Sequence, residues 1–249
     1  MVTLSVNVNK IATLRNSRGG DQPNVVQAAR TCIEAGCHGI TVHPRPDGRH
    51  IRTLDVLDLA AMLTVEFNIE GYPSPEFLEL VCRVRPTQCT LVPDPPDVLT
   101  SNAGWNLHAE VAWLSDVLNR LHDHGIRTSL FLDPDPDQVR RAKDIGTDRI
   151  ELYTEHYAKM FATAERERVY ETYYRAALVA QEVGLGVNAG HDLNLDNLPF
   201  LAQNLPGLLE VSIGHALICD ALYMGLRPAV QAYLQTLGYT QHHQDSPSP

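Results

Sequence analysis

Short apolar runs alternate with longer segments of helical periodicity along almost the whole chain. The runs, rich in Val, Ile and Leu, predict eight strands at residues 3–8, 38–43, 66–70, 88–92, 126–132, 148–153, 185–189 and 209–213. Strands that alternate with helices and lack a polar face are typical of parallel sheets covered by helices. Eight such units predict an α/β fold, a single (β/α)8 TIM barrel with extra helices. A doubly wound open sheet is the alternative.

The segments between these strands repeat apolar residues at helical spacing, and several end in a glycine that suits a helix C-terminus. They lie at residues 25–36, 54–63, 75–84, 110–125, 136–146, 167–184, 195–205 and 221–237. With 249 residues, of which 44% are hydrophobic, the chain can bury the core of one such barrel. We expect the barrel to occupy residues 1–238 and residues 239–249, which lack periodicity, to form a disordered tail.

Composition and charge argue against several classes of protein. The sequence contains no run of about 18 apolar residues, the length that a transmembrane helix needs. The N-terminus lacks the basic and apolar regions of a secretory signal. The 5 cysteines are odd in number and lack C-x-x-C spacing, so we expect reduced core residues in the cytoplasm. A net charge of −10 argues against nucleic acid or an anionic membrane as a partner. An anionic ligand would therefore need a local cationic site.

Polar residues follow the predicted strands at their C-terminal ends, where such barrels build their active sites. In chain order these residues are Asn7, Asn9, Lys10, Arg15, Arg18, His43, Arg45, His50, Glu70, Thr100, Glu151, Asn188, Gly190, His191, Ser212, Gly214 and His215. A single histidine at a strand end is more often structural than catalytic, but three at the same rim favour a catalytic site. Glu70 and Glu151 have an alternative role as ion-pair partners of arginine, and Arg15 is expected on a solvated loop.

Two glycine-containing stretches predict phosphate binding. They are NAGH at 188–191 and SIGHA at 212–216, directly after the seventh and eighth strands. Glycine lets the backbone approach an anion, and amides at the start of the next helix donate to it. The alternative is that these glycines only make tight turns. Lys10, Arg18 and Arg45 form a second cationic group, so the pattern indicates substrates with two anionic groups.

The motifs resemble those of the pyridoxine 5'-phosphate synthase family, which closes the pyridine ring in vitamin B6 biosynthesis. The resemblance runs in order from Leu4 to about Ala232, in VNVNKIATLRNSRG, GITVHPRPDGRHI, NIE, NAGHDLNLDN and SIGHALI. It implies a homo-octameric TIM barrel without metal or organic cofactor. It also implies condensation of 3-amino-2-oxopropyl phosphate with 1-deoxy-D-xylulose 5-phosphate to give pyridoxine 5'-phosphate, inorganic phosphate and water.

The resemblance also implies a role for each matching position. The aminoketone phosphate would be held by Asn7, Arg18, Gly214 and His215, and the deoxyxylulose phosphate by Asn9, Lys10, Arg45, His50 and Thr100. The proton acceptors would be His43 and Glu70, the proton donor His191, and Glu151 would stabilise intermediates. Histidines suit this chemistry because they titrate near neutral pH.

The chain departs from the family pattern at two places. Some members have Asp-His where this chain has Asn9 and Lys10, so a proton transfer by that pair is not carried over. Some have Gly where this chain has Asp192, whose carboxylate would repel a phosphate unless it is turned away.

Two other classes of function remain open. A metal-dependent hydrolase would use His43, His191, His215 and Glu151 as ligands, although the cationic rim disfavours a divalent ion. A non-catalytic sugar-phosphate binding protein would keep the glycines and arginines without needing the proton-transfer groups. The stretch VPDPPDVLTSNAGWN, at 92–106, is predicted to be a mobile lid that a ligand protects from proteolysis.

Overall fold

The computed structural model describes residues 1–93, 103–108 and 111–240. Within them, parallel strands close into a barrel in the order β1 to β8, and β8 pairs with β1. The strands are β1 Thr3–Asn7, β2 Gly39–Val42, β3 Glu66–Gly71, β4 Gln88–Leu91, β5 Arg127–Leu132, β6 Arg149–Tyr153, β7 Gly186–Gly190 and β8 Leu208–Ile213. The predicted TIM barrel is confirmed, and the alternative of an open sheet is wrong.

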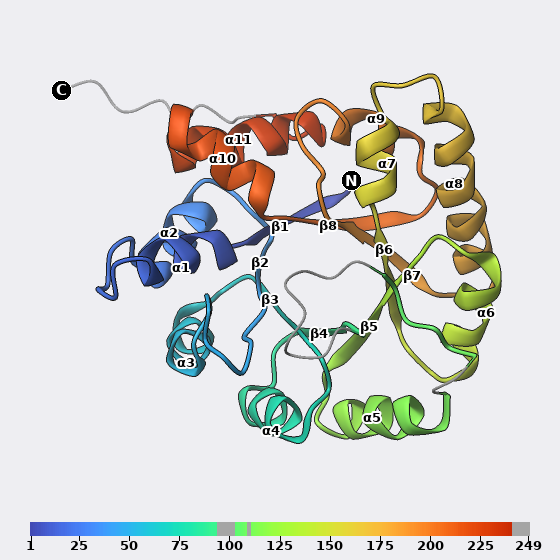
Figure 1. Cartoon of the computed structure of the whole chain (residues 1–249), viewed down its shortest axis with the longest axis horizontal. Coiled ribbons are helices and arrows are strands. Elements are labelled where there is room, and N and C mark those ends of the chain that lie inside the picture. Colours follow the sequence, from blue (N-terminus) through green and yellow to red (C-terminus); the bar gives the residue numbers. More distant parts are fainter. Residues whose placement is uncertain (94–102, 109–110, 241–249) are drawn as a thin grey trace.

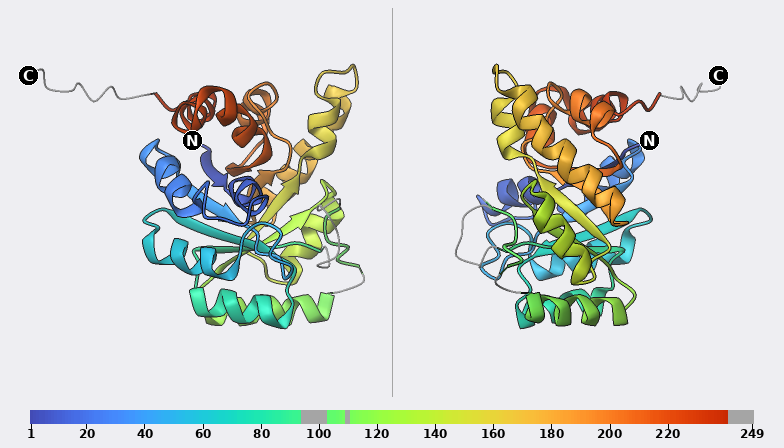
Figure 2. Two further views of the ribbon diagram at one scale, coloured as in Figure 1. Left: turned by 60° about the vertical axis from the view of Figure 1, so that its left-hand side comes forward. Right: turned by 90° about the vertical axis from the view of Figure 1, so that its right-hand side faces the viewer.

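Helices surround the strands on the outside of the barrel (Figure 1). In the described residues they are α1 Asn9–Asn16, α2 Val25–Glu34, α3 Thr53–Met62, α4 Pro75–Val84, α5 Val111–Asp123, α6 Pro136–Asp144, α7 Glu155–Met160, α8 Arg166–Glu182, α9 Leu198–Asn204, α10 His215–Met224 and α11 Leu226–Thr236. Figure 2 shows the C-terminal helices beside the N-terminal strand, so the two ends of the described chain lie on the same side of the barrel.

The structure differs from the predicted helices at three places. Helix α1 follows β1 after one residue, where a loop was expected. The sequence did not predict this helix because its only buried residues, Ala12 and Arg15, give no apolar stripe. Helix α7 is only six residues long, too short for a periodic signal. The predicted helix 221–237 is two helices that meet at Gly225, whose φ of 89° ends α10 and starts α11 in a new direction.

The apolar core lies between the strands and the helices. Outward-facing strand residues such as Leu4, Val6 and Ile69 are fully buried and belong to one continuous apolar cluster with residues of the surrounding helices. Polar caps start some of these helices: the Ser74 hydroxyl accepts a hydrogen bond from the Phe77 N–H at the start of α4, with a distance of 3.2 Å. This packing fixes the positions of the strand ends.

The inner faces of the strands carry polar side chains. The hydroxyls of Ser5 and Thr41 lie 2.7 Å apart, and Thr90 Oγ1 donates to Asn68 Oδ1 at 3.0 Å. All four residues are buried. Since most TIM barrels fill this space with branched aliphatic residues, the expectation of continuously apolar strands is wrong for these inner faces. The floor of the barrel mouth is consequently polar.

In the part of the chain that is described, no helix is both long and apolar enough to cross a membrane. Residues 241–249 of the predicted tail lie outside the described residues, and the predicted domain bounds stay a prediction.

Candidate active site

The closed parallel barrel brings the predicted site residues to one mouth. Asn7 ends β1, His43 follows β2 directly, Glu70 is the last residue but one of β3, and Glu151 is the middle residue of β6. His191 follows β7 directly. Because the strands are parallel, all these ends meet at the same side of the barrel.

Three polar side chains meet at the floor of this mouth. His43 Nδ1 lies 3.9 Å from Glu70 Oε2, and Asn7 Nδ2 donates to the same carboxylate oxygen at 3.4 Å. The side chains of His43 and Glu70 are only 12% and 13% exposed. A substrate bound here would contact an imidazole and a carboxyl group together, the pair that general acid–base catalysis uses.

Asn9 connects the start of α1 to the His43 segment. Its backbone N–H donates to Asn7 Oδ1 at 3.0 Å, and its own Oδ1 accepts a hydrogen bond from the His43 N–H at 2.9 Å. The side-chain amide oxygen of Asn9 therefore holds the His43 backbone in place. Lys10, the next residue of α1, is exposed.

Burial changes the protonation of the two carboxyl groups. It raises the pKa of Glu70 to about 8, with a further increase from Glu210 and a decrease from Arg45. It also raises the pKa of Glu151 well above its usual value, and the charges of Glu70 and Glu210 add to this effect. Glu151 Oε2 has no hydrogen-bond partner among the described residues. With a pKa of about 8, Glu70 can accept and release protons near neutral pH.

The two histidines after β2 are neutral at physiological pH. Desolvation, followed by the charge of Arg45, lowers the pKa of His43 well below 6.5. Desolvation also lowers the pKa of His50 to about 4, and the nearby charges of Arg45, Lys10 and Arg49 contribute. The rings of the two histidines lie 6.1 Å apart, edge to face. A neutral imidazole is thus available as a base beside a group of cations that suits a phosphate.

A buried ion pair holds the segment that carries His50. Arg15 donates to both carboxylate oxygens of Asp55, at 2.5 and 2.8 Å, and to the His50 carbonyl at 3.2 Å. Asn16 Nδ2 donates to the same carbonyl at 2.8 Å. Arg15 is only 3% exposed. The expectation of a solvated Arg15 on a loop is wrong, because α1 turns this side chain inward toward α3.

His191 and Asp192 have an unusual backbone conformation, with φ angles of 88° and 58°. Aspartate is among the few residues that tolerate this left-handed region, which explains how Asp192 can occupy a position that would suit glycine. The carboxylate of Asp192 is not turned away from the site: Oδ2 lies 3.4 Å from His191 Nδ1, although the contact lacks hydrogen-bond geometry. Interactions with His191, and the charges of His215 and Lys159, lower the pKa of Asp192.

The end of β8 comes close to the end of β1. A Cβ atom on Gly214 would lie 3.1 Å from Asn7 Cβ, so only glycine leaves this approach unhindered. Helix α10 starts at His215, and its first backbone amides suit an anion. His215 itself is exposed, and its Nε2 lies 3.6 Å from Cys219 Sγ.

The remaining predicted residues differ in burial. Arg18 is exposed in the turn after α1, whereas Arg45 is only 8% exposed. Thr100 and most of the predicted lid lie outside the described residues.

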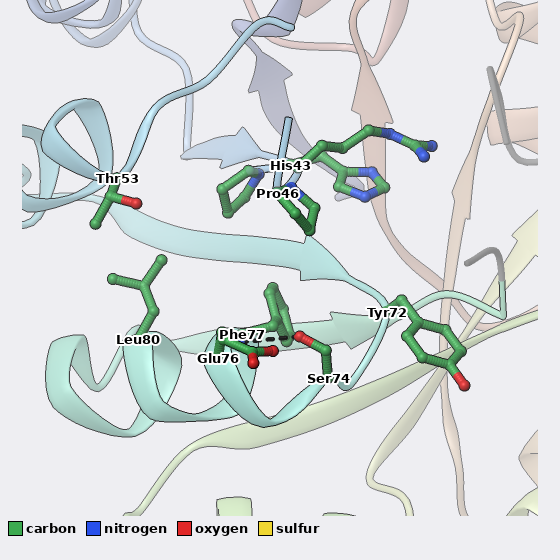
Figure 3. Close-up of a pocket in the computed structure, with 10 residues that line it drawn as sticks. His43, Pro46, Thr53, Tyr72, Ser74, Glu76, Phe77 and Leu80 are labelled. Atoms are coloured by element: carbon green, nitrogen blue, oxygen red, sulfur yellow. Dashed lines mark hydrogen bonds between the residues drawn. The ribbon is translucent and has the colours of Figure 1, made fainter. Parts of the chain in front are cut away.

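A cavity of about 160 Å³ lies next to the site, between the segment after β2 and helix α4 (Figure 3). His43 and Pro46 line one side of it, and Phe77 and Leu80 line the α4 side. The cavity therefore flanks the candidate catalytic histidine from outside the barrel mouth.

Sequence reasoning missed Glu210 and Thr154. Burial raises the pKa of Glu210 to about 7, and this residue in turn raises the pKa values of Glu70 and Glu151. The sequence did contain a signal for Glu210, which lies within the apolar run LEVSI. A charged residue in a buried strand is costly and therefore indicates a functional or structural role. Thr154 follows β6 directly and touches the His191 segment, which no spacing in the sequence indicates.

Among the described residues, no three or more His, Cys, Asp or Glu side chains form a group that could hold a metal ion. The ligand set expected for a hydrolase, His43, His191, His215 and Glu151, is not such a group.

The sequence profile of a family described as "Pyridoxal phosphate biosynthesis protein PdxJ" matches residues 4–239. The chain is similar to proteins named pyridoxine 5'-phosphate synthase. The one from Bacteroides thetaiotaomicron is 54% identical over 237 residues, which are 95% of this chain and 100% of that protein. The one from Porphyromonas gingivalis is 54% identical and covers 95% of this chain and 99% of its own.

Solved structures of other enzymes share the fold. Phosphoribosylanthranilate isomerase from Thermotoga maritima aligns with a TM-score of 0.59 at 11% identity, over 96% of this chain and 99% of its own. Tryptophan synthase from M. tuberculosis aligns with a TM-score of 0.64 at 15% identity, over 96% of this chain and 93% of its own. At these identities the likeness shows the barrel alone.

Proposed function

The chain belongs to the PdxJ family of pyridoxal phosphate biosynthesis proteins, and we propose that it is a pyridoxine 5'-phosphate synthase. This ring-closing transferase would condense 3-amino-2-oxopropyl phosphate with 1-deoxy-D-xylulose 5-phosphate and release pyridoxine 5'-phosphate, inorganic phosphate and water. The observation that carries the proposal is the meeting of His43 with Glu70 at a polar barrel mouth, 3.9 Å apart. The relatives of that name match this chain over nearly its whole length.

Proton transfer would be divided among four residues. His43 and Glu70 would accept protons from carbon and nitrogen, His191 would protonate the departing oxygen, and Glu151 would stabilise the cationic intermediates. The lowered pKa of His43 keeps its imidazole neutral, which is the form that can accept a proton. The raised pKa of Glu70, about 8, lets this group exchange protons near neutral pH. No metal or organic cofactor is proposed.

The two phosphates would bind on different sides of the mouth. Asn7, Arg18, Gly214 and His215 would hold the aminoketone phosphate, supported by the helix start at α10. The deoxyxylulose phosphate would be held by Asn9, Lys10, Arg45, His50 and Thr100. The cations that lower the pKa of His50 support this second site.

The family resemblance also supports a proposal on assembly and location. We propose a homo-octamer in the cytoplasm, with residues 1–238 as the barrel catalytic domain and residues 239–249 as a disordered C-terminal tail. Analytical ultracentrifugation of the purified protein tests the octamer.

The decisive experiment is an assay of EDTA-treated protein with both substrates, with pyridoxine 5'-phosphate followed by chromatography. We expect product without added metal. His43→Ala and His191→Ala are each expected to reduce kcat by about 10²–10⁴-fold. The control is His124→Ala, at the opposite end of the barrel, where the ring contacts the Arg120 carbonyl. Binding of both phosphates without turnover would contradict the proposal and support a sugar-phosphate binding protein.

A further inference from the structure

The backbone that carries His191 has a conformation that side chains other than glycine rarely adopt. His191 and Asp192 follow each other with φ angles of 88° and 58°. Aspartate and histidine reach this region more readily than most residues, but still at a cost in free energy that surrounding contacts have to offset. The contacts to the carbonyl groups of residues 190–192 therefore show what fixes the imidazole.

Thr154 makes the closest of these contacts. Its Oγ1 lies 2.7 Å from the Gly190 carbonyl oxygen and 2.6 Å from the His191 carbonyl oxygen, so one hydroxyl proton is shared between two acceptors. The Thr154 N–H also donates to the Gly190 carbonyl at 3.0 Å. Thr154 is fully buried, which makes these hydrogen bonds costly to lose.

Other contacts fix the two sides of this segment. Asn197 Nδ2 donates to the Asp192 carbonyl at 3.1 Å. The His191 ring lies edge to face against Tyr153, with ring centroids 4.9 Å apart, and Tyr153 packs on Phe131 at 5.1 Å. The imidazole thus has a fixed aromatic wall, and the backbone conformation decides how the ring meets it.

We propose that Thr154 is a positioning residue, whose hydroxyl holds the left-handed backbone at His191 and thereby sets the place of the imidazole at the barrel mouth. Thr154 reaches this backbone because Tyr153 and Gly190 are paired across β6 and β7. The catalytic consequence rests on the proposed function, in which His191 donates a proton. The effect of Thr154 on the His191 backbone does not depend on the proposed function.

Three variants separate positioning from general stability. Thr154→Val removes the hydroxyl and keeps the shape, and Thr154→Ser keeps the hydroxyl. The matched control is Thr147→Val: Thr147 is 3% exposed, donates to the Arg149 carbonyl at 3.0 Å, and precedes β6 at its other end. Displacement of a catalytic group by about 1 Å can cost about 10²-fold in rate.

We expect Thr154→Val to lower kcat by about 10–100-fold with KM changed by less than about threefold. Thr154→Ser is expected to restore most of kcat, and Thr147→Val to keep it. In a His191→Ala background, Thr154→Val should cause no further loss of kcat, because its effect passes through the missing ring. Full kcat in Thr154→Val, or an equal loss in both backgrounds, would overturn the proposal.

Crystal structures of Thr154→Val and Thr147→Val provide a test that needs no activity. We expect the backbone at His191 to leave the left-handed region, or the ring to leave Tyr153, only in Thr154→Val. An unchanged His191 in that variant would overturn the proposal even if the protein makes pyridoxine 5'-phosphate. If His191 is displaced in Thr154→Val and the unsubstituted protein makes no pyridoxine 5'-phosphate, the positioning role is upheld and the proposed function is contradicted.

Discussion

At the scale of single residues, burial separates Glu70 from the carboxyl groups on the protein surface. Its pKa of about 8 means that the group is mostly protonated at neutral pH and ionises as the pH rises. If Glu70 accepts a proton in catalysis, only the ionised form works. We therefore expect kcat/KM to rise with pH, with a midpoint near 8. Glu70→Gln should lose this rise together with about 10²–10⁴-fold of activity. An unchanged rise in Glu70→Gln would assign it to another group.

The same group makes stability depend on pH. The folded protein keeps a proton on Glu70 that the unfolded chain releases above a pKa of about 4.5, so Glu70 lowers stability as the pH rises from about 4.5 through 8. The glutamine of Glu70→Gln does not ionise, so this contribution to the pH dependence of stability is absent from the variant. Urea unfolding measures the free energy of unfolding of both proteins at pH 5 and pH 8. The value for Glu70→Gln minus that for the unsubstituted protein should increase from pH 5 to pH 8. A constant difference between the two proteins would contradict the raised pKa.

Asp192 places a negative charge next to two histidines of the mouth. Replacing it with glycine should remove the repulsion of a phosphate and suit the φ of 58°. We expect inorganic phosphate to bind about 3–10-fold more tightly to Asp192→Gly by isothermal titration calorimetry. Asp192→Asn separates the two effects, because it removes the charge and keeps a side chain. Weaker phosphate binding in both variants would mean that the carboxylate supports the site.

At the scale of elements, α1 and α3 are joined by the buried pair of Arg15 and Asp55. Asp55→Asn removes the charge opposite a guanidinium that is only 3% exposed, so it should cost about 3 kcal/mol of unfolding free energy. Arg15 also binds the carbonyl of His50, which we propose to hold deoxyxylulose phosphate, so KM for that proposed substrate should rise as well.

The control for this pair is Glu34→Gln. This substitution breaks the ion pair between Arg227 and Glu34, whose side chains are 46% and 55% exposed. It should cost less than about 1 kcal/mol of unfolding free energy. Urea unfolding measures both variants. Equal losses in Asp55→Asn and Glu34→Gln would show that burial does not strengthen the Arg15 pair.

The elements also show how far sequence reasoning reaches. The strands were predictable because each carries apolar residues that pack outward on helices, and their parallel order placed His43, Glu70 and His191 at one mouth. Helix α1 was not predictable because its inner face holds the charged Arg15, whose partner lies 40 residues away. The role of Thr154 was hidden for a similar reason, since its acceptors follow a different strand.

At the scale of the whole molecule, the barrel combines a polar interior with an apolar outer layer. Glu151 and Glu210 are each 3% exposed inside the barrel. Their charged forms would be costly there, and this cost is what raises their pKa values. Stability must therefore come from the layer between strands and helices. The last two helices of the described chain, α10 and α11, complete this apolar layer.

Truncation tests how much of that layer the barrel needs. Ending the chain after Gly225 removes α11, in which Val230 and Tyr233 are fully buried and Tyr233 donates to Asp220 at 2.8 Å. Each large buried side chain contributes about 1.5–3 kcal/mol, a substantial part of the 5–15 kcal/mol typical of a domain. We expect this truncated protein to lack a cooperative thermal transition, whereas ending the chain after residue 240 should keep Tm within about 2 °C. Tyr233→Ala, expected to cost about 3–5 kcal/mol, shows the same dependence without truncation. A folded chain that ends at Gly225 would place the boundary of the barrel before α11.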